Sequence, residues 1–103
     1  MEIVEVGTIF YNMWGYDQTN IDWYQVVSKT PKTITVKAIE CVNVEDTPTS
    51  MTGVTTPISG AFKPNAKPHR RSLRVTPYGI KANAEYGSLS VWDGKPKHYS
   101  TYA

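Results

Sequence analysis

The sequence has one cysteine, two histidines and two leucines among its 103 residues. A single thiol, Cys41, excludes an internal disulfide framework, and two histidines leave few ligands for a zinc site. No apolar run approaches the roughly 20 residues that span a bilayer, and the first ten residues lack the basic segment that begins a secretory signal. We therefore expect a soluble domain of a reducing compartment, with no metal, no cofactor and no membrane partner.

β-Branched residues are abundant in the sequence, whereas leucine and alanine are scarce. The chain has 10 valines, 7 isoleucines and 12 threonines against 2 leucines and 6 alanines. Branching at Cβ restricts rotamers on a helix and suits the pleated surface of a sheet. The composition predicts an all-β, mainly antiparallel domain spanning residues 1–103, with at most one short helix.

Alternation of apolar and polar residues predicts three strands, at 3–11, 22–28 and 33–41, with a proline turn at 29–32 that joins the last two into a hairpin. Shorter strands are predicted at 70–76, 80–83, 88–92 and 97–102, with turns at 77–79 and 93–94. Residues 82–86 alternatively form one helical turn.

Between residues 42 and 68 the alternation is lost, and the stretch contains four prolines and two glycines. It is predicted to be a long irregular loop, with Val54 and Ile58 pinning part of it as an edge strand. Five or six short strands with long loops indicate a small, strongly bent sheet or an SH3-like barrel; an open antiparallel sheet with a loop draped over one face is the alternative.

Charge is divided unevenly along the chain, although the net charge is only +2. No acid occurs from residue 47 to residue 84, a window that also contains His69 and Lys81. Within it we single out as an anion-binding face, for nucleic-acid phosphates or an acidic protein, Lys63, Lys67, Arg70, Arg71 and Arg74. Strand alternation would place Arg70 and Arg74 on the face opposite Arg71. A solvated basic loop that aids solubility is the competing interpretation.

Aromatic residues crowd around the loop that follows the first predicted strand. In this loop the candidate partner-binding residues are Trp14, Tyr16, Asp17 and Asn20. Exposed tryptophan and tyrosine provide stacking platforms for bases and anchors for protein partners. Aromatics also dominate small cores, so the same cluster could instead cap the open end of a barrel.

Signals for catalysis are sparse. Asp17 and Asp22 form a conceivable carboxylate pair, but the sequence does not give their separation. Cys41 at a strand end is typical of a small buried side chain. The chain contains no glycine-rich phosphate loop, nucleophile elbow or metal-ligand spacing, and we expect a protein that is not an enzyme.

Several short motifs carry a resemblance. The segments VGTIFY (6–11), WGYDQTN (14–20) and WYQVV (23–27), with WDGKP (92–96) and a terminal Tyr-Ala, resemble a group of small proteins found in phages and other mobile elements. The likeness covers the first 40 residues and the last dozen or so, and it leaves the middle of the chain unmatched.

The resemblance implies a setting, the cytoplasm of a bacterial host, and a role that depends on binding. Small phage accessory proteins often block host defence complexes, so the first hypothesis is an anti-CRISPR-like or other counter-defence inhibitor. Its partner would be a host or effector protein, or a nucleoprotein complex. The alternative is an SH3-like nucleic-acid-binding module that uses the basic 63–74 segment. A structural or assembly protein anchored by its tryptophan loop is a third possibility.

Overall fold

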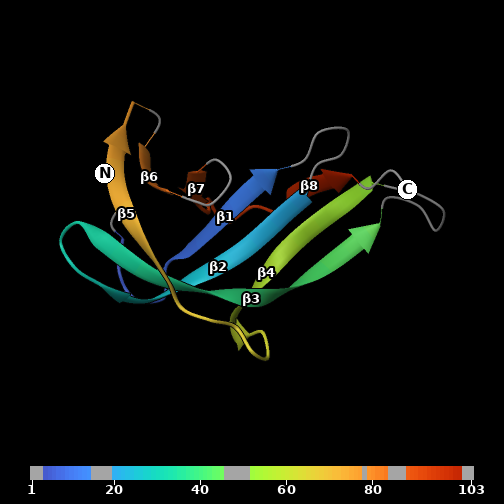
Figure 1. The fold of residues 1–103 in the computed structure, drawn as a ribbon. Helices are drawn as coiled ribbons and strands as arrows, with labels where there is room; N and C mark the ends of the chain where they lie inside the picture. Colours follow the sequence, from blue (N-terminus) through green and yellow to red (C-terminus); the bar gives the residue numbers. More distant parts are fainter. Residues whose placement is uncertain (1–3, 15–19, 46–51, 78, 84–87, 101–103) are drawn as a thin grey trace.

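The computed structural model describes residues 4–14, 20–45, 52–77, 79–83 and 88–100. These residues form eight strands, β1 to β8, shown in Figure 1. The strands are β1 (Ile9–Trp14), β2 (Asn20–Lys29), β3 (Thr33–Glu45), β4 (Thr52–Phe62), β5 (His69–Thr76), β6 (Gly79–Asn83), β7 (Ser88–Val91) and β8 (Lys97–Ser100). Every recorded pairing is antiparallel, which confirms the predicted class. The described residues contain no helix, and so none that could cross a bilayer.

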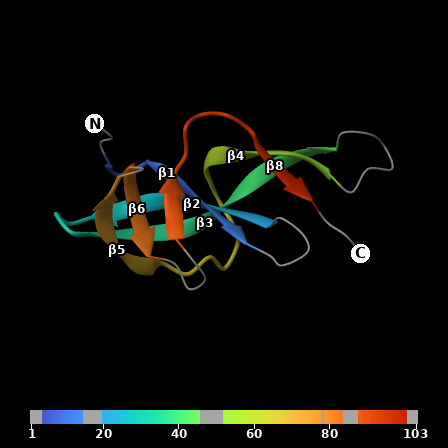
Figure 2. The same cartoon turned by 90° about the horizontal axis from the view of Figure 1, so that it is seen from above.

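Six of the strands close into a ring. β1 pairs with β2 and β7, β2 pairs with β3, the first half of β3 pairs with β5, and β6 lies between β5 and β7. The ring therefore has no open edge, and the barrel interpretation is confirmed over the open sheet. Figure 2 shows these strands gathered at one end of the molecule.

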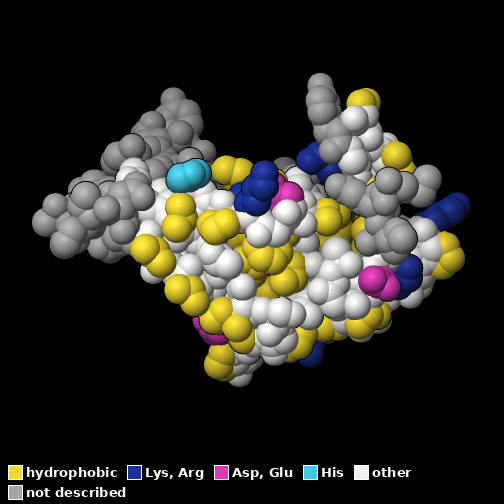
Figure 3. Space-filling view, turned by 180° about the vertical axis from the view of Figure 1, so that it is seen from behind, with side chains coloured by type: hydrophobic (Ala, Val, Ile, Leu, Met, Phe, Trp, Pro, Cys, Tyr) yellow, Lys and Arg dark blue, Asp and Glu magenta, His cyan; other side chains and the backbone are white. Residues whose placement is uncertain are grey.

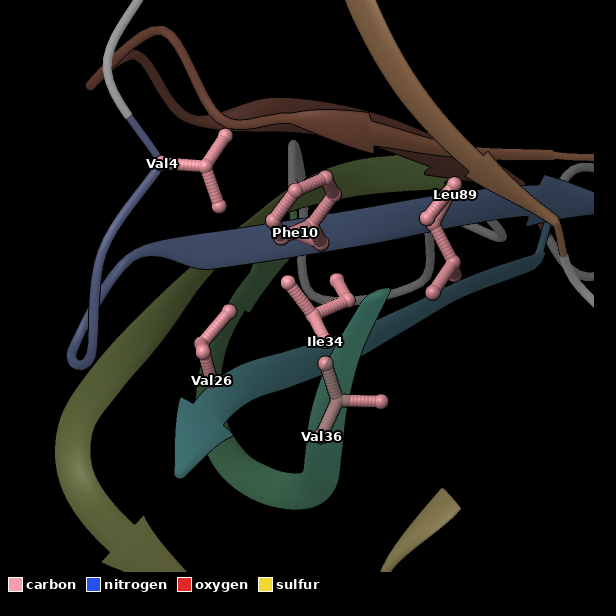
Figure 4. Packing of buried hydrophobic residues seen from close by; sticks show 7 residues of the cluster. Val4, Phe10, Val26, Ile34, Val36 and Leu89 are labelled. Carbon is pink, nitrogen blue, oxygen red and sulfur yellow. The ribbon is translucent and has the colours of Figure 1, made fainter. Parts of the chain in front are cut away.

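The interior of the ring is apolar. Phe10, Ile34, Val36, Ala82 and Leu89 are buried there, and Val4 and Val26 complete the cluster. Figure 4 shows these side chains converging from different strands. Apart from Val4, which precedes β1, these residues lie on strands, where successive side chains point to opposite faces, so the next residue on each strand points outward.

β3 is long enough to leave the barrel. Its second half, from Ile39 to Glu45, pairs with β4, and β4 pairs with β8. We call this three-stranded part the wing. One face of the wing covers the outside of β1 and β2 and encloses a second core, formed by Ile9, Trp23 and Ile39.

Two side chains of β2 hold the wing in place. The indole Nε1 of Trp23 donates to Thr55 Oγ1 at 3.0 Å in a buried contact. Two residues further on, Gln25 Oε1 accepts the backbone N–H of Gly60 at 2.7 Å. Because Trp23 and Gln25 lie on the same outer face of β2, β4 crosses that face.

The predicted loop at 42–68 is wrong in most of its length, although Val54 and Ile58 lie on a strand as expected. Val42 to Glu45 continue β3, and β4 alone takes up eleven residues of the stretch. Pro57 is tolerated because it lies beyond Thr55, where the pairing of β4 with β8 ends and the strand has a described neighbour on one side only. Residues 63–68 form the connection between β4 and β5, and residues 46–51 of the predicted loop lie outside the described residues.

The predicted strand at 3–11 begins too early. Gly7 has a φ of 99°, and a turn is closed there by Thr8, whose N–H donates to Glu5 O and whose Oγ1 accepts the N–H of Glu5. The strand therefore starts at Ile9. The hairpin at 29–32 and the strands beginning near residues 70, 80, 88 and 97 are confirmed.

Candidate functional site

The basic residues of β5 separate by face. Leu73 packs against the barrel core, and Arg71 lies on its side of the strand, half-buried. Arg70 and Arg74 are exposed on the outer side, as alternation predicts. Arg71 therefore does not join them, and its Nη1 donates instead to the backbone oxygen of Arg70 at 3.3 Å.

Lys81 joins Arg74 on the outer side. The β5–β6 pairing sets Arg74 directly opposite Lys81, one position away from the opposed pair Leu73 and Ala82 that faces the core. Side chains directly opposite on one face of an antiparallel pair have Cβ atoms about 4.5–5.5 Å apart. Two cations are thus held side by side across the strand pair.

Serines on β7 hold both cations. Arg74 Nη2 donates to Ser88 Oγ, and Lys81 Nζ donates to Ser90 Oγ at 2.7 Å. Neither cation makes an ion pair with a described residue. The hydroxyls orient the two charged groups without neutralising them.

Polar residues extend this surface onto β3. Arg70 is opposite Thr35, and Ser72 is opposite Thr33. We call the outward-facing set the basic face: Thr33, Thr35, Arg70, Ser72, Arg74, Lys81, Ser88 and Ser90. It combines three cations with hydroxyl groups, which are the groups that bind phosphate oxygens.

The two remaining predicted cations lie outside the basic face. Lys63 and Lys67 are exposed in the connection between β4 and β5. The backbone N–H of Lys63 donates to Ala38 O at 3.1 Å, which fixes the start of that connection against β3. Among the five predicted cations, the structure thus brings together Arg70 and Arg74, and it adds Lys81.

Lys81 is the residue that sequence reasoning missed. It falls in the acid-free window but is not among the five cations predicted to bind anions. The predicted turn could have identified it. With Thr76 opposite Gly79, counting back two residues on β5 and forward two on β6 sets Arg74 opposite Lys81.

The predicted aromatic loop falls largely outside the described residues. Tyr16 and Asp17 are outside them, so the structure gives no distance between Asp17 and Asp22. Trp14 is described only as the last residue of β1. Asn20 begins β2 and is half-buried, and its Nδ2 has no hydrogen-bond partner among the described residues. The partner-binding role of these four residues stays a prediction.

The other aromatics have structural positions. Phe10 fills the barrel, whereas Trp23 lies outside it, with its ring centre 5.8 Å from that of Tyr11 and 5.7 Å from that of Trp92. These contacts build the second core. They do not cap the end of the barrel.

A lysine closes the exposed side of this aromatic group. Lys97 Nζ lies 4.8 Å from the centre of the Tyr11 ring and 3.1 Å from Asp93 Oδ2. The pKa of Asp93 is lowered, first by the backbone N–H of Lys95, which its Oδ1 accepts at 3.0 Å, and then by the bond from Lys97. This cation is already paired within the chain, unlike those of the basic face.

Groups that could support catalysis are dispersed. Cys41 is half-buried, and its Sγ contacts Asn43 Oδ1 at 3.5 Å. Within the part of the chain that the structure describes, no three histidine, cysteine, aspartate or glutamate side chains are grouped so as to hold a metal ion.

No protein-family model, curated protein or solved structure matches the chain.

Proposed function

We propose that the protein is a non-enzymatic nucleic-acid-binding module that contacts phosphates through the basic face. The observation that carries this proposal is the direct opposition of Arg74 and Lys81 on neighbouring strands. Like charges in that position destabilise an antiparallel pair. A phosphate that bridges the two cations offsets the repulsion.

Arg70 extends the contact along β5. It lies four residues before Arg74 on the same outer side, about 13 Å away at the rise of an extended strand. The two guanidinium groups can therefore reach different phosphates of one backbone. Threonine and serine hydroxyls between them supply further donors of the kind that contact phosphate and sugar.

The counter-defence role that the resemblance implies stays a prediction. A basic face could serve it by holding guide RNA or displaced DNA of a host complex. It would equally serve a protein of the mobile element's own replication, so phosphate binding is the property to test first.

The test is the affinity of the purified protein for labelled single- and double-stranded DNA and RNA, measured by fluorescence anisotropy across a salt series. The test variant is Arg70→Glu/Arg74→Glu. The matched control is Lys95→Glu/Lys67→Glu, which changes the net charge equally at two exposed lysines outside the basic face.

We expect wild-type affinity to fall steeply with salt, with a slope in log K of about −0.7 to −0.9 per phosphate contact. The Arg70/Arg74 variant should lose binding at every salt concentration, and the control should keep most of it. Absence of wild-type binding at about 50 mM salt, or equal losses in both variants, would contradict the proposal.

A further inference from the structure

The second half of β3 has one edge that no described strand pairs with. Pairing of β3 with β2 ends at Ala38, and from Ile39 onward the described strands pair with β3 only through β4. In Figure 1 this part of β3 runs along the lower right border of the ribbon, with β4 on its inner side. Val42, Asn43 and Val44 are all exposed, so both faces of the strand are uncovered here.

The other edges of the wing carry features that discourage pairing. β8 has Lys97 and His98, and the free part of β4 has Pro57, which lacks an N–H, and Gly60, whose N–H is already bonded to Gln25. Lysines, prolines and irregularities are the usual protections of an edge strand. The segment of β3 from Cys41 to Val44 has none of these protections.

Side chains along this edge are apolar on one face. Val42 is 51% exposed and Val44 is 57% exposed, and Ile58 of β4, on the same side of the wing, is 41% exposed. Figure 3, which views the molecule from behind, shows hydrophobic side chains at the surface, some of them at the wing end of the molecule. An extended edge with exposed valines is a template for another strand.

We propose that a second copy of this chain pairs with this edge, β3 against β3, about a two-fold axis at Asn43. That register sets Val42 opposite Val44 of the second copy, and Val44 opposite Val42, so that each valine meets a valine. Asn43 meets Asn43, and an amide pair can donate and accept at once. The same register sets Cys41 opposite Glu45 at the two ends of the pair. A register centred on Val42 would instead place Glu40 opposite Val44 and leave neither valine opposite a valine of another position.

The resulting dimer joins two wings into one six-stranded antiparallel sheet. Its interface is a single strand pair, so we expect weak association, in the upper micromolar range. The proposal does not depend on nucleic-acid binding.

The test combines sedimentation equilibrium with cross-linking. The wild type should show a monomer–dimer equilibrium between about 10 µM and about 1 mM protein. Val44→Lys should weaken dimerisation about tenfold or more, because it places a charge at the paired edge. Val75→Lys is the matched control, since Val75 is 86% exposed on β5, in the barrel, and should leave dimerisation unchanged.

A cysteine pair reports the register. In a Cys41→Ser background, Asn43→Cys should give covalent dimers with a short thiol cross-linker, whereas Ser72→Cys, exposed on the barrel, should not. Circular dichroism and thermal melts establish that each variant is folded. A wild-type monomer at all concentrations, a dimer insensitive to Val44→Lys, or no cross-link at position 43 would overturn the proposal.

Discussion

At the scale of single residues, Trp23 links the two parts of the molecule. Trp23 is 2% exposed, and its indole lies between Tyr11, in a tilted contact, and Trp92, in an edge-to-face contact. It donates its one hydrogen bond to Thr55 on β4. A buried N–H that loses its acceptor still carries its full desolvation penalty, with no hydrogen bond to compensate for it. The attachment of the wing therefore depends on this bond.

We predict that Thr55→Val lowers the free energy of unfolding by about 1–3 kcal/mol, since valine has the shape of threonine and cannot accept the indole N–H. The measurement is urea unfolding followed by tryptophan fluorescence. Thr56→Val, the neighbouring position on the outer face of β4, is the control and should have little effect. Equal stability of Thr55→Val and wild type would show that the bond does not hold the wing.

Asp93 gives a second prediction, in the pH dependence of stability. Its pKa is lowered from an ordinary 3.8 by the Lys95 N–H and by Lys97, so the ionised form stabilises the fold. That contribution is complete above the ordinary pKa and is lost as pH falls through the lowered one.

Wild type should therefore be slightly more stable than Asp93→Asn at neutral pH, and the difference should vanish in acid. The effect is small because the carboxylate is exposed. Unfolding curves of both proteins from neutral pH to pH below 3.8 measure it. A difference that persists unchanged at the lowest pH would mean that charge is not its cause.

At the scale of elements, the β5–β6 hairpin shows how much the sequence can predict. Alternation in 70–76 correctly separated Arg70 and Arg74 from Arg71, and the turn at 77–79 fixed the register that faces Arg74 with Lys81. Such local features depend on neighbouring residues only, and sequence reasoning reads them well.

β4 shows where sequence reasoning fails. Its prolines, glycines and threonines are typical of a loop, and its strand conformation depends on contacts from distant residues. Thr55 and Gly60 are bonded to Trp23 and Gln25, more than 30 positions earlier in the chain. The residues next to Thr55 and Gly60 in the sequence do not indicate hydrogen bonds to such distant partners, so the strand could not be predicted from composition.

The hairpin carries the third prediction. Lys81→Glu turns a pair of like charges into an opposite pair with Arg74, and we expect it to raise the free energy of unfolding by about 0.5 kcal/mol. The same change should weaken nucleic-acid binding. A gain in stability coupled to a loss of binding indicates that the opposed cations are kept for a ligand.

Thermal melts and anisotropy on the same preparation measure both effects. Lys95→Glu, which has no cation opposite it in a strand pair, should show neither change. Destabilisation by Lys81→Glu with binding unchanged would mean that the two cations are not a phosphate site.

At the scale of the whole molecule, the barrel and the wing divide the surface into separate regions. The basic face is the outward-facing surface of β3, β5, β6 and β7. The second core covers the outer side of β1 and β2. The sequence predicted a basic region and an all-β fold, but not that ring closure would collect cations from β5 and β6 beside serines of β7. That arrangement follows from the order of strands around the barrel, which alternation does not determine.

Mapping the bound surface by nuclear magnetic resonance is the most direct test of the central claim. Backbone amide shifts of the labelled protein are followed while a short oligonucleotide is added. The account predicts the largest changes at Arg70, Ser72, Arg74, Lys81 and Ser90, and little change at Val42 to Val44. Changes concentrated instead around Asn20 and the neighbouring loop, with the basic face unmoved, would contradict it.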